Sequence, residues 1–373
     1  MKYTYMKDLA LELPSGFVKS DMPDPGSLHL QSSSFTLRFL PVQIGDLSES
    51  MALSVKRRMH YAEDNSEGTM EMENTIPFGA EPQIKRKLRV TDGLASMTMD
   101  LVMRNSCYLT TVCAGGFTMG GIIRRIGLLA MDEKKRILQD FRWQDLAELP
   151  EGSVLYEGAT PPLGISLETD SQRVDFAPGD DLWRWMGASR LNGTALFRIV
   201  KEKDSVSSHW QLFIKNPPRS GEEETPIPGK NWRLTWAVAW KDLSAENVLL
   251  PVQDGAKVFS IDQLKGDKRL LCKTAERACL CANGTQNLLK KFVRSHLETV
   301  QEGDELYLSG MEAALCTNAG HMDRAKQKEL LHWDMMSLLD FVRWSNKALS
   351  RKGAHLTVTV PEGSPLKGFM IFR

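Results

Sequence analysis

The sequence predicts a soluble, mainly β protein: a large antiparallel β-sandwich with a long C-terminal helix packed on it. Strand-like runs alternate apolar and polar residues, with turn signals at short intervals and almost no helical periodicity between residues 151 and 241. An apolar stripe at helical spacing within residues 323–350 predicts the helix. Hydrophobic residues make up 42% of the 373, which is enough for a sizeable core.

These patterns divide the chain into three parts. Residues 1–27 are expected to form a lead-in segment, and residues 28–285 the antiparallel sandwich. Residues 286–373 form a helix-containing C-terminal segment. We expect its last two strands, at 355–360 and 369–372, to return to the sheet of the sandwich.

The charges indicate no polyanionic partner. Lysine and arginine together number 47, as do aspartate and glutamate, so the chain has no overall positive field. Lys85, Lys87 and Arg89 share one face of a strand that precedes a tight turn at Asp92-Gly93. Because no other segment extends this charge, we interpret it as a solvated outer face, and expect neither nucleic acid nor a membrane as partner.

Three further features predict a cytoplasmic protein. The first residues, MKYTYMKDLALELPSG, lack the uninterrupted apolar run of a secretory signal. The longest apolar-looking run, residues 112–131, carries two arginines at its centre, which argues against a membrane span. The six cysteines form no CxxC pair or regular framework, so we expect reduced thiols.

Tryptophan is concentrated in one stretch of the chain. Six of the nine tryptophans lie between residues 183 and 240. In the strand predicted at 231–240, Trp232, Trp236 and Trp240 share one face, and the opposite face carries only small or polar residues. We interpret these three rings as core.

A first candidate site combines tryptophans with charged residues. In extended geometry Asp181, Trp183 and Trp185 share a face, next to the guanidinium groups of Arg184 and Arg190. Indole rings that stack on the C–H face of a pyranose, beside groups that bind its hydroxyls, form a sugar site. This pattern predicts a carbohydrate as ligand.

Glu168 and His209 join this site if neighbouring strands pair. A carboxylate beside a histidine can perform general acid and base catalysis on a sugar, so Glu168, His209 and Asp181 are the candidate catalytic residues. The structural alternative is that the tryptophans are core and that the Asp and Arg neighbours form ion pairs that fix a turn.

A second candidate site lies at the predicted start of the long helix. His321, Asp323 and Arg324 form one cluster there, and His332 lies eleven residues after His321. That gap is about 16 Å of helical rise, too far for both imidazoles to bind one metal, and no HExxH motif is present. We expect no metal and no cofactor. The alternative is that these histidines bond the backbone where the helix meets the sheet.

The order of features from about residue 28 to 261 resembles the supersandwich of galactose-mutarotase-like proteins. The segments that carry the resemblance are LRVTDGLASMTMDL, GDDLWRWMGASRLNG and NWRLTWAVAW, and it covers about two thirds of the chain. In such enzymes a histidine and a glutamate act on the anomeric centre. The resemblance implies that role for His209 and Glu168 by position alone.

Three hypotheses for function follow. The first is a carbohydrate-binding or carbohydrate-modifying protein, either similar to an epimerase or mutarotase or associated with a lyase. The second is a noncatalytic assembly or interaction protein whose tryptophans are all core and whose helix binds a partner or a second copy. The third is a metalloenzyme centred on His321 and His332.

Overall fold

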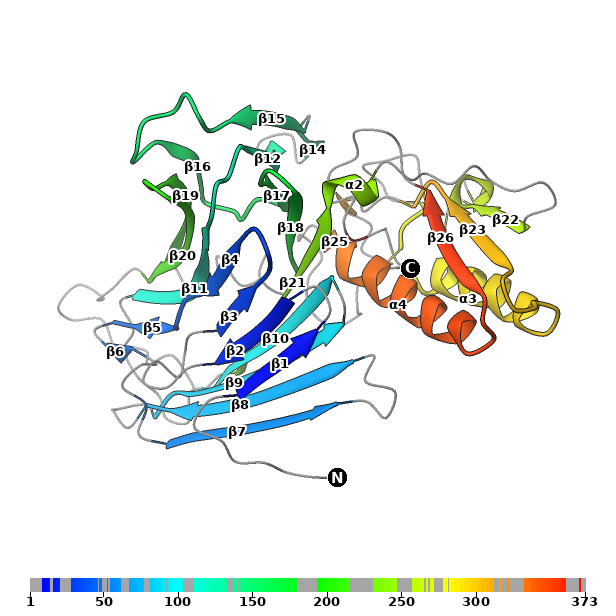
Figure 1. Cartoon of the computed structure of the whole chain (residues 1–373), viewed down its shortest axis with the longest axis horizontal. Helices are drawn as coiled ribbons and strands as arrows, with labels where there is room; N and C mark the ends of the chain where they lie inside the picture. The colour runs from blue at the N-terminus through cyan, green and yellow to red at the C-terminus, as the bar shows by residue number, and fades with distance from the viewer. Residues whose placement is uncertain are drawn as a thin grey trace, which may run out of the picture.

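The computed structural model describes most of both large sheets and most of the C-terminal segment (Figure 1). The described residues are 9–13, 16–20, 28–45, 47–48, 52, 54–61, 67–76, 81–91, 93–102, 111–132, 137–139, 141–179, 193–214, 231–246, 257–264, 266–267, 269–271, 278–280, 282–311, 315–316, 321, 332–359 and 369.

Ten strands form the first large sheet, sheet A. Its main path runs β1-β2-β3-β4-β11-β20-β19-β16, with β5 beside β11 and β6 beside β5, and every pair is antiparallel. The strands span Leu9–Leu13 (β1), Gly16–Ser20 (β2), Leu28–Gln31 (β3), Thr36–Phe39 (β4), Gln43–Ile44 (β5), Leu47–Ser48 (β6), Thr111–Gly120 (β11), Val154–Gly158 (β16), Gly193–Lys201 (β19) and Ser205–Ile214 (β20). Strands β1 and β2 thus extend the sheet into residues 1–27, where the sequence predicted a lead-in.

Nine strands form the second large sheet, sheet B, in the order β15-β12-β17-β18-β21-β10-β9-β8-β7, again antiparallel. They span Ser54–Tyr61 (β7), Gly68–Thr75 (β8), Gln83–Thr91 (β9), Leu94–Val102 (β10), Arg125–Leu129 (β12), Arg142–Asp145 (β15), Gly164–Glu168 (β17), Gln172–Pro178 (β18) and Asn231–Asp242 (β21). These two antiparallel sheets confirm the predicted mainly β fold.

The main core fills the space between the two sheets. Trp210 of sheet A meets Phe176 and Trp236 of sheet B, with ring centroids 5.5 and 5.6 Å apart. Trp236 and Trp240 are 4% and 2% exposed, which confirms that these rings are core. The alternation along β21 directs them inward because successive side chains of a strand point to opposite faces.

Residues 257–359 contain a separate small sheet. Strands β22 (Lys257–Ser260), β23 (Glu305–Ser309) and β26 (His355–Thr359) pair in parallel, in the order β22-β23-β26. Helices α3 (Asn283–Leu297) and α4 (Met335–Ser350) lie in the two crossovers, as parallel pairing requires. The shorter elements are α2 (Leu243–Glu246), a 3₁₀ turn at Ile261–Leu264, β24 (Leu315–Cys316) and β25 (His332–Trp333).

This topology differs from the predicted division of the chain in two further respects. Among the described residues, the last strand in either large sheet is β21, which ends at Asp242, whereas the sequence extended the sandwich to residue 285. The strand expected at 355–360 is β26, and it joins β23 instead of the sandwich. None of the helices in the described part of the chain is long and apolar enough to cross a membrane.

The long helix is shorter than the sequence predicted. It begins at Met335, not near Asp323, because His332 and Trp333 form β25 and pair with Cys316 and Leu315. The apolar stripe of α4 itself is confirmed: Leu338, Val342 and Leu349 are fully buried.

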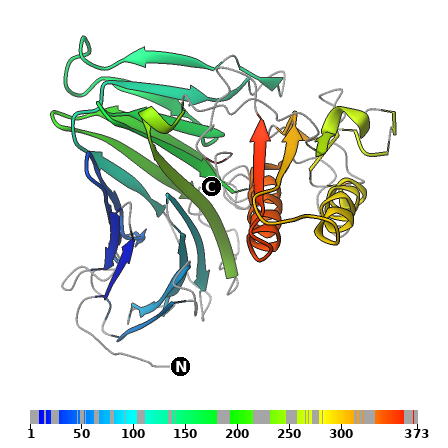
Figure 2. The ribbon, with the colours of Figure 1, turned by 45° about the vertical axis from the view of Figure 1, so that its right-hand side comes forward.

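Helix α4 packs on the outer face of sheet B, the face that points away from the main core. Its buried residues form a second core with Leu94, Ala237 and Ala239 of that face. Figure 2 shows α4 between the sandwich and α3. Arg343 Nη1 donates a hydrogen bond to Ser96 Oγ on β10 at 2.8 Å, so the contact also has a polar link.

Candidate functional site

Most of the first predicted site lies outside the described residues. This holds for Asp181, Trp183, Arg184, Trp185 and Arg190, so the carbohydrate site inferred from them stays a prediction. Asp323 and Arg324 of the second predicted site also lie outside the described residues.

His209 and Glu168 lie on different sheets. His209 belongs to β20 and alternates with Trp210, which is buried in the core, so the imidazole is on the outer face of sheet A. Glu168 belongs to β17 and alternates with buried Leu167, so its carboxylate is on the outer face of sheet B. The whole sandwich therefore separates the two groups, and they cannot act together on one anomeric carbon.

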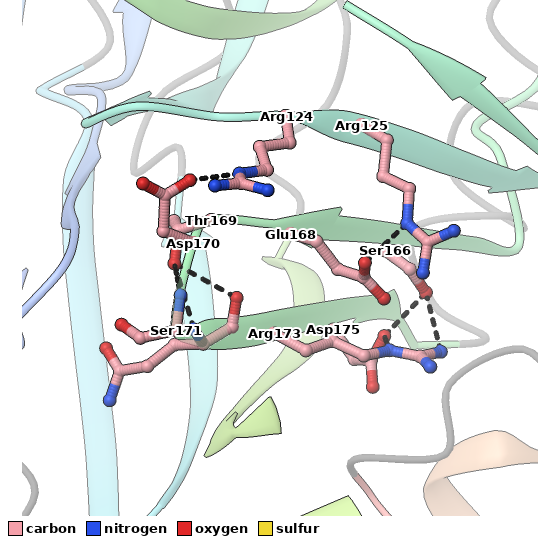
Figure 3. A network of polar contacts seen from close by, with 10 residues as sticks. Arg124, Arg125, Ser166, Glu168, Thr169, Asp170, Ser171, Arg173 and Asp175 are labelled. Atoms are coloured by element: carbon pink, nitrogen blue, oxygen red, sulfur yellow. Dashed lines mark hydrogen bonds and ion pairs between the residues drawn. The ribbon is translucent and has the colours of Figure 1, made fainter. Parts of the chain in front are cut away.

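Glu168 is part of an ion-pair cluster on the outer face of β12, β17 and β18 (Figure 3). Its carboxylate accepts a hydrogen bond from Arg125 Nε, and the Glu168 side chain is 7% exposed. The Arg125 guanidinium also lies over the ring of Trp143, 4.4 Å from its centroid. Arg124 beside it pairs with Asp170, and this hydrogen bond is the main cause that raises the pKa of Arg124.

The other half of the cluster is sealed from water. Asp175 is fully buried and accepts hydrogen bonds from Ser166 Oγ at 2.5 Å and from Arg173 Nε at 3.0 Å. Arg173 Nη2 also donates to Ser166 Oγ at 3.3 Å. Buried charges in proteins are usually paired in this way, and removing one partner is costly. The cluster thus fits a structural role, in which Glu168 is committed to Arg125.

A more accessible feature lies on the outer face of the same sheet, over β7, β8, β9, β10 and β21. It is a hollow of about 420 Å³, which we call the charged hollow. Its lining contains five basic and three acidic residues, together with a threonine and a methionine: Arg58, Lys85, Arg86, Lys87, Arg233, Glu71, Glu73, Asp100, Thr98 and Met72.

The strand register produces the charge pattern of the hollow. Thr98 lies opposite Lys87, and Lys87 lies opposite Glu71. In the next row Asp100 has Arg233 on one side and Lys85 on the other. Side chains directly opposite each other in an antiparallel pair are close enough to interact, so each row becomes a ladder of alternating charge.

The ion pairs of the hollow are solvent-exposed. Arg233 donates two hydrogen bonds to the carboxylate of Asp100, from Nε to Oδ1 at 2.8 Å and from Nη2 to Oδ2 at 2.9 Å. The Arg233 side chain is 59% exposed. Lys87 Nζ is 2.9 Å from Glu71 Oε1, and Lys85 Nζ is 3.9 Å from Glu73 Oε2. Exposed pairs of this kind contribute only about 0–1 kcal/mol to stability. Their polar groups can therefore turn to a ligand at little cost.

Part of this hollow was predictable from the sequence. The shared outer face of Lys85, Lys87 and Arg89 is confirmed, since Lys85 and Arg89 are exposed while Leu88 and Val90 are buried. The acidic partners on β8 were missed, because the register of β8 against β9 sets them and no pattern within one strand reveals it.

The backbone of His332 and the ring of His321, from the second predicted site, both lie beside Cys316. His332 is in β25, opposite Cys316 in β24. His321 hydrogen-bonds the backbone, as the structural alternative expected: its Nε2 is 2.6 Å from the carbonyl oxygen of Arg269. Its Nδ1 is 3.4 Å from Cys316 Sγ, a contact that the sequence did not predict.

No known protein family and no curated protein matches this chain. Among solved structures, an α-N-acetylgalactosaminidase from Bifidobacterium bifidum matches with a TM-score of 0.37 and 9% identity, covering 94% of this chain and 58% of that one. The chain thus spans little more than half the length of that enzyme.

Two shorter solved proteins also match. A galactose mutarotase related enzyme from Lactobacillus acidophilus has 10% identity and a TM-score of 0.34, covering 63% of this chain and 97% of that one. A putative aldose 1-epimerase from Escherichia coli K12 has 9% identity and a TM-score of 0.36, covering 65% and 100%. At these identities and TM-scores the matches carry no argument about substrate or activity. The structures that this chain matches thus include galactose-mutarotase-like proteins, the group whose resemblance was predicted from the sequence.

Proposed function

We propose that this protein binds a carbohydrate in the charged hollow, with a preference for a sugar that carries a carboxylate. The single observation that supports the proposal is the hollow itself, an open depression of about 420 Å³ whose lining is almost entirely charged. Small-molecule sites commonly measure about 300–1,000 Å³, so one or two pyranose rings fit.

The chemistry of the lining suits a polyhydroxylated ligand. Carboxylates accept hydrogen bonds from sugar hydroxyls, and guanidinium and ammonium groups donate to hydroxyl or carboxylate oxygens. Arg86 is 4% exposed and lies on the inner face of β9, so four basic side chains face the hollow against three acidic ones, an excess that favours an anionic sugar. Arg233 is the strongest candidate for the carboxylate of that sugar, because its planar guanidinium binds carboxylates with two parallel hydrogen bonds.

Isothermal titration with three matched sugars tests the proposal: galacturonic acid, galactose and galactosamine, which differ in charge on a shared ring. We expect galacturonic acid to bind most tightly and galactosamine most weakly. Arg233→Ala should weaken galacturonic acid binding by about tenfold to a hundredfold, since a hydrogen bond to a charged group contributes about 1.5–3 kcal/mol.

Arg198→Ala is the matched control. Arg198 also forms an exposed ion pair on a sheet face, with its Nε 3.3 Å from Glu157 Oε2, but it lies on sheet A. This variant should bind galacturonic acid as the unaltered protein does. Binding that survives Arg233→Ala, or the absence of binding for all three sugars, would overturn the proposal. A stable oligomer in light scattering with no sugar response would favour the assembly hypothesis instead.

A further inference from the structure

We propose that Cys279, Cys316 and His321 bind a zinc ion that ties together the C-terminal segment. One ligand atom from each residue lies within 4.8 Å of the other two. Both cysteines are fully buried, and neither forms a disulfide. Nitrogen and sulfur ligands of this kind select zinc in preference to the oxygen-binding cations calcium and magnesium.

The orientation of the imidazole suits a metal ligand. The carbonyl oxygen of Arg269 can only accept a hydrogen bond, so the contact at 2.6 Å places the proton of neutral His321 on Nε2. The lone pair of Nδ1 then points toward the thiols. A zinc-binding histidine commonly donates its second ring N–H to a carbonyl or carboxylate, which fixes the tautomer in this way.

The distances agree with tetrahedral coordination. Zinc binds sulfur at about 2.3 Å and nitrogen at about 2.0–2.1 Å, and at the tetrahedral angle these lengths place S and N about 3.5 Å apart. Cys316 Sγ and His321 Nδ1 are 3.4 Å apart. Cys316 and His321 thus hold their ligand atoms near the spacing of a metal-bound pair, and Cys279 Sγ lies within 4.8 Å of both.

The surrounding backbone gives the cluster a scaffold but little regular structure. Cys279 N–H donates to the carbonyl of Leu270 at 2.7 Å, and Leu280 N–H donates to the buried carboxylate of Asp334 at 3.1 Å. Cys316 lies in β24, whose pairing with β25 involves only two residues on each strand. A ribbon this short is not stable alone, so a metal cross-link would supply what the hydrogen bonds do not.

The described residues supply three of the four ligands that tetrahedral zinc takes. Cys272 and Cys281, which flank Cys279 in the sequence, lie outside the described residues. The sequence alone did not predict the cluster, because its three residues come from separate segments and match no zinc-finger spacing.

Metal analysis of the full-length protein, purified under reducing conditions without chelator and reloaded with zinc, tests the proposal. We expect about one zinc per chain in the unaltered protein. Cys316→Ser and His321→Ala should each lose most of it, while Cys113→Ser, which removes a thiol of sheet A, should retain it.

Cobalt substitution of the unaltered protein keeps the test decisive if a variant does not fold. Tetrahedral cobalt with thiolate ligands gives intense visible absorption and a thiolate-to-cobalt charge-transfer band, and both should disappear when excess zinc is added. Two results would overturn the proposal: substoichiometric zinc with no cobalt spectrum in the unaltered, reduced protein, or full zinc content in folded Cys316→Ser.

Discussion

The indole rings of Trp210 and Trp236 meet edge to face across the two sheets, with centroids 5.6 Å apart and planes at 81°. The two rings differ in one respect. Trp210 Nε1 donates to Ser208 Oγ at 2.9 Å, whereas Trp236 Nε1 is buried and has no hydrogen-bond acceptor among the described residues.

This difference predicts unequal costs for the same substitution. Trp210→Phe and Trp236→Phe remove similar volumes, but only the first leaves a buried hydroxyl without its donor. We expect Trp210→Phe to lower the free energy of unfolding by about 1–3 kcal/mol more than Trp236→Phe, measured by urea denaturation. Ser208→Ala in the Trp210→Phe background should recover part of the difference. Equal costs for the two single variants would show that the hydrogen bond does not matter.

Gly116 is predicted to be irreplaceable in β11. Its φ is +138°, and a Cβ atom there would lie 1.9 Å from the carbonyl oxygen of Ser208 on the neighbouring strand. Gly116→Ala should therefore cost about 3 kcal/mol or more, since the strands must separate to admit the methyl group.

Gly152→Ala is the matched control for Gly116. Gly152 also has a positive φ, +82°, but a Cβ atom there would meet nothing within 4 Å. Only the backbone conformation is then unfavourable, at a cost of roughly 1–2 kcal/mol in urea denaturation. A Gly116→Ala protein as stable as Gly152→Ala would contradict the close approach of β11 and β20.

Cys113 is predicted to react slowly with alkylating agents. Burial is the main cause that raises the pKa of its thiol above 9.0, outweighing backbone hydrogen bonds that lower it. Because the thiolate is the nucleophile, a raised pKa lowers the fraction of Cys113 that is thiolate at pH 8, and the residue reacts more slowly. We expect iodoacetamide to modify Cys113 more slowly in the native than in the urea-denatured protein at pH 8, with the difference narrowing as the pH rises above 9. Peptide mass spectrometry separates this thiol from the others. Equal native and denatured rates at pH 8 would rule the prediction out.

The same pKa shift predicts a pH dependence of stability. A thiol whose pKa is higher in the folded than in the unfolded protein contributes stability below its unfolded pKa and loses it as the pH rises through the folded value. The unfolding free energy of Cys113→Ser should therefore fall less than that of the unaltered protein between pH 8 and pH 10.

The features of the fold that depend on the local pattern of apolar and polar residues were predicted from the sequence. Alternation along β21 was enough to assign Trp236 and Trp240 to the core. Helix α3 (Asn283–Leu297) lies almost entirely in the segment 286–373 that was expected to contain helix, and its apolar residues recur at helical spacing.

Long-range pairing was not predictable in the same way. Which sheet a strand joins depends on partners far along the chain, so His209 and Glu168 could not be assigned to opposite faces from the sequence. The predicted start of the long helix was wrong because the two residues of β25 are placed by pairing with Leu315 and Cys316, not by local propensity. The charged hollow and the thiol–imidazole cluster both arise from such pairings.

The apolar residues of sheet B that α4 covers determine whether the sandwich can be produced without the C-terminal segment. Leu94, Ala177, Ala237 and Ala239 form an apolar floor on sheet B that helix α4 covers. A gene fragment ending after β21 would leave that floor bare, and bare apolar patches on a sheet promote aggregation. The sandwich is therefore not a transferable module. Recombination that moves it to another protein must also move helix α4.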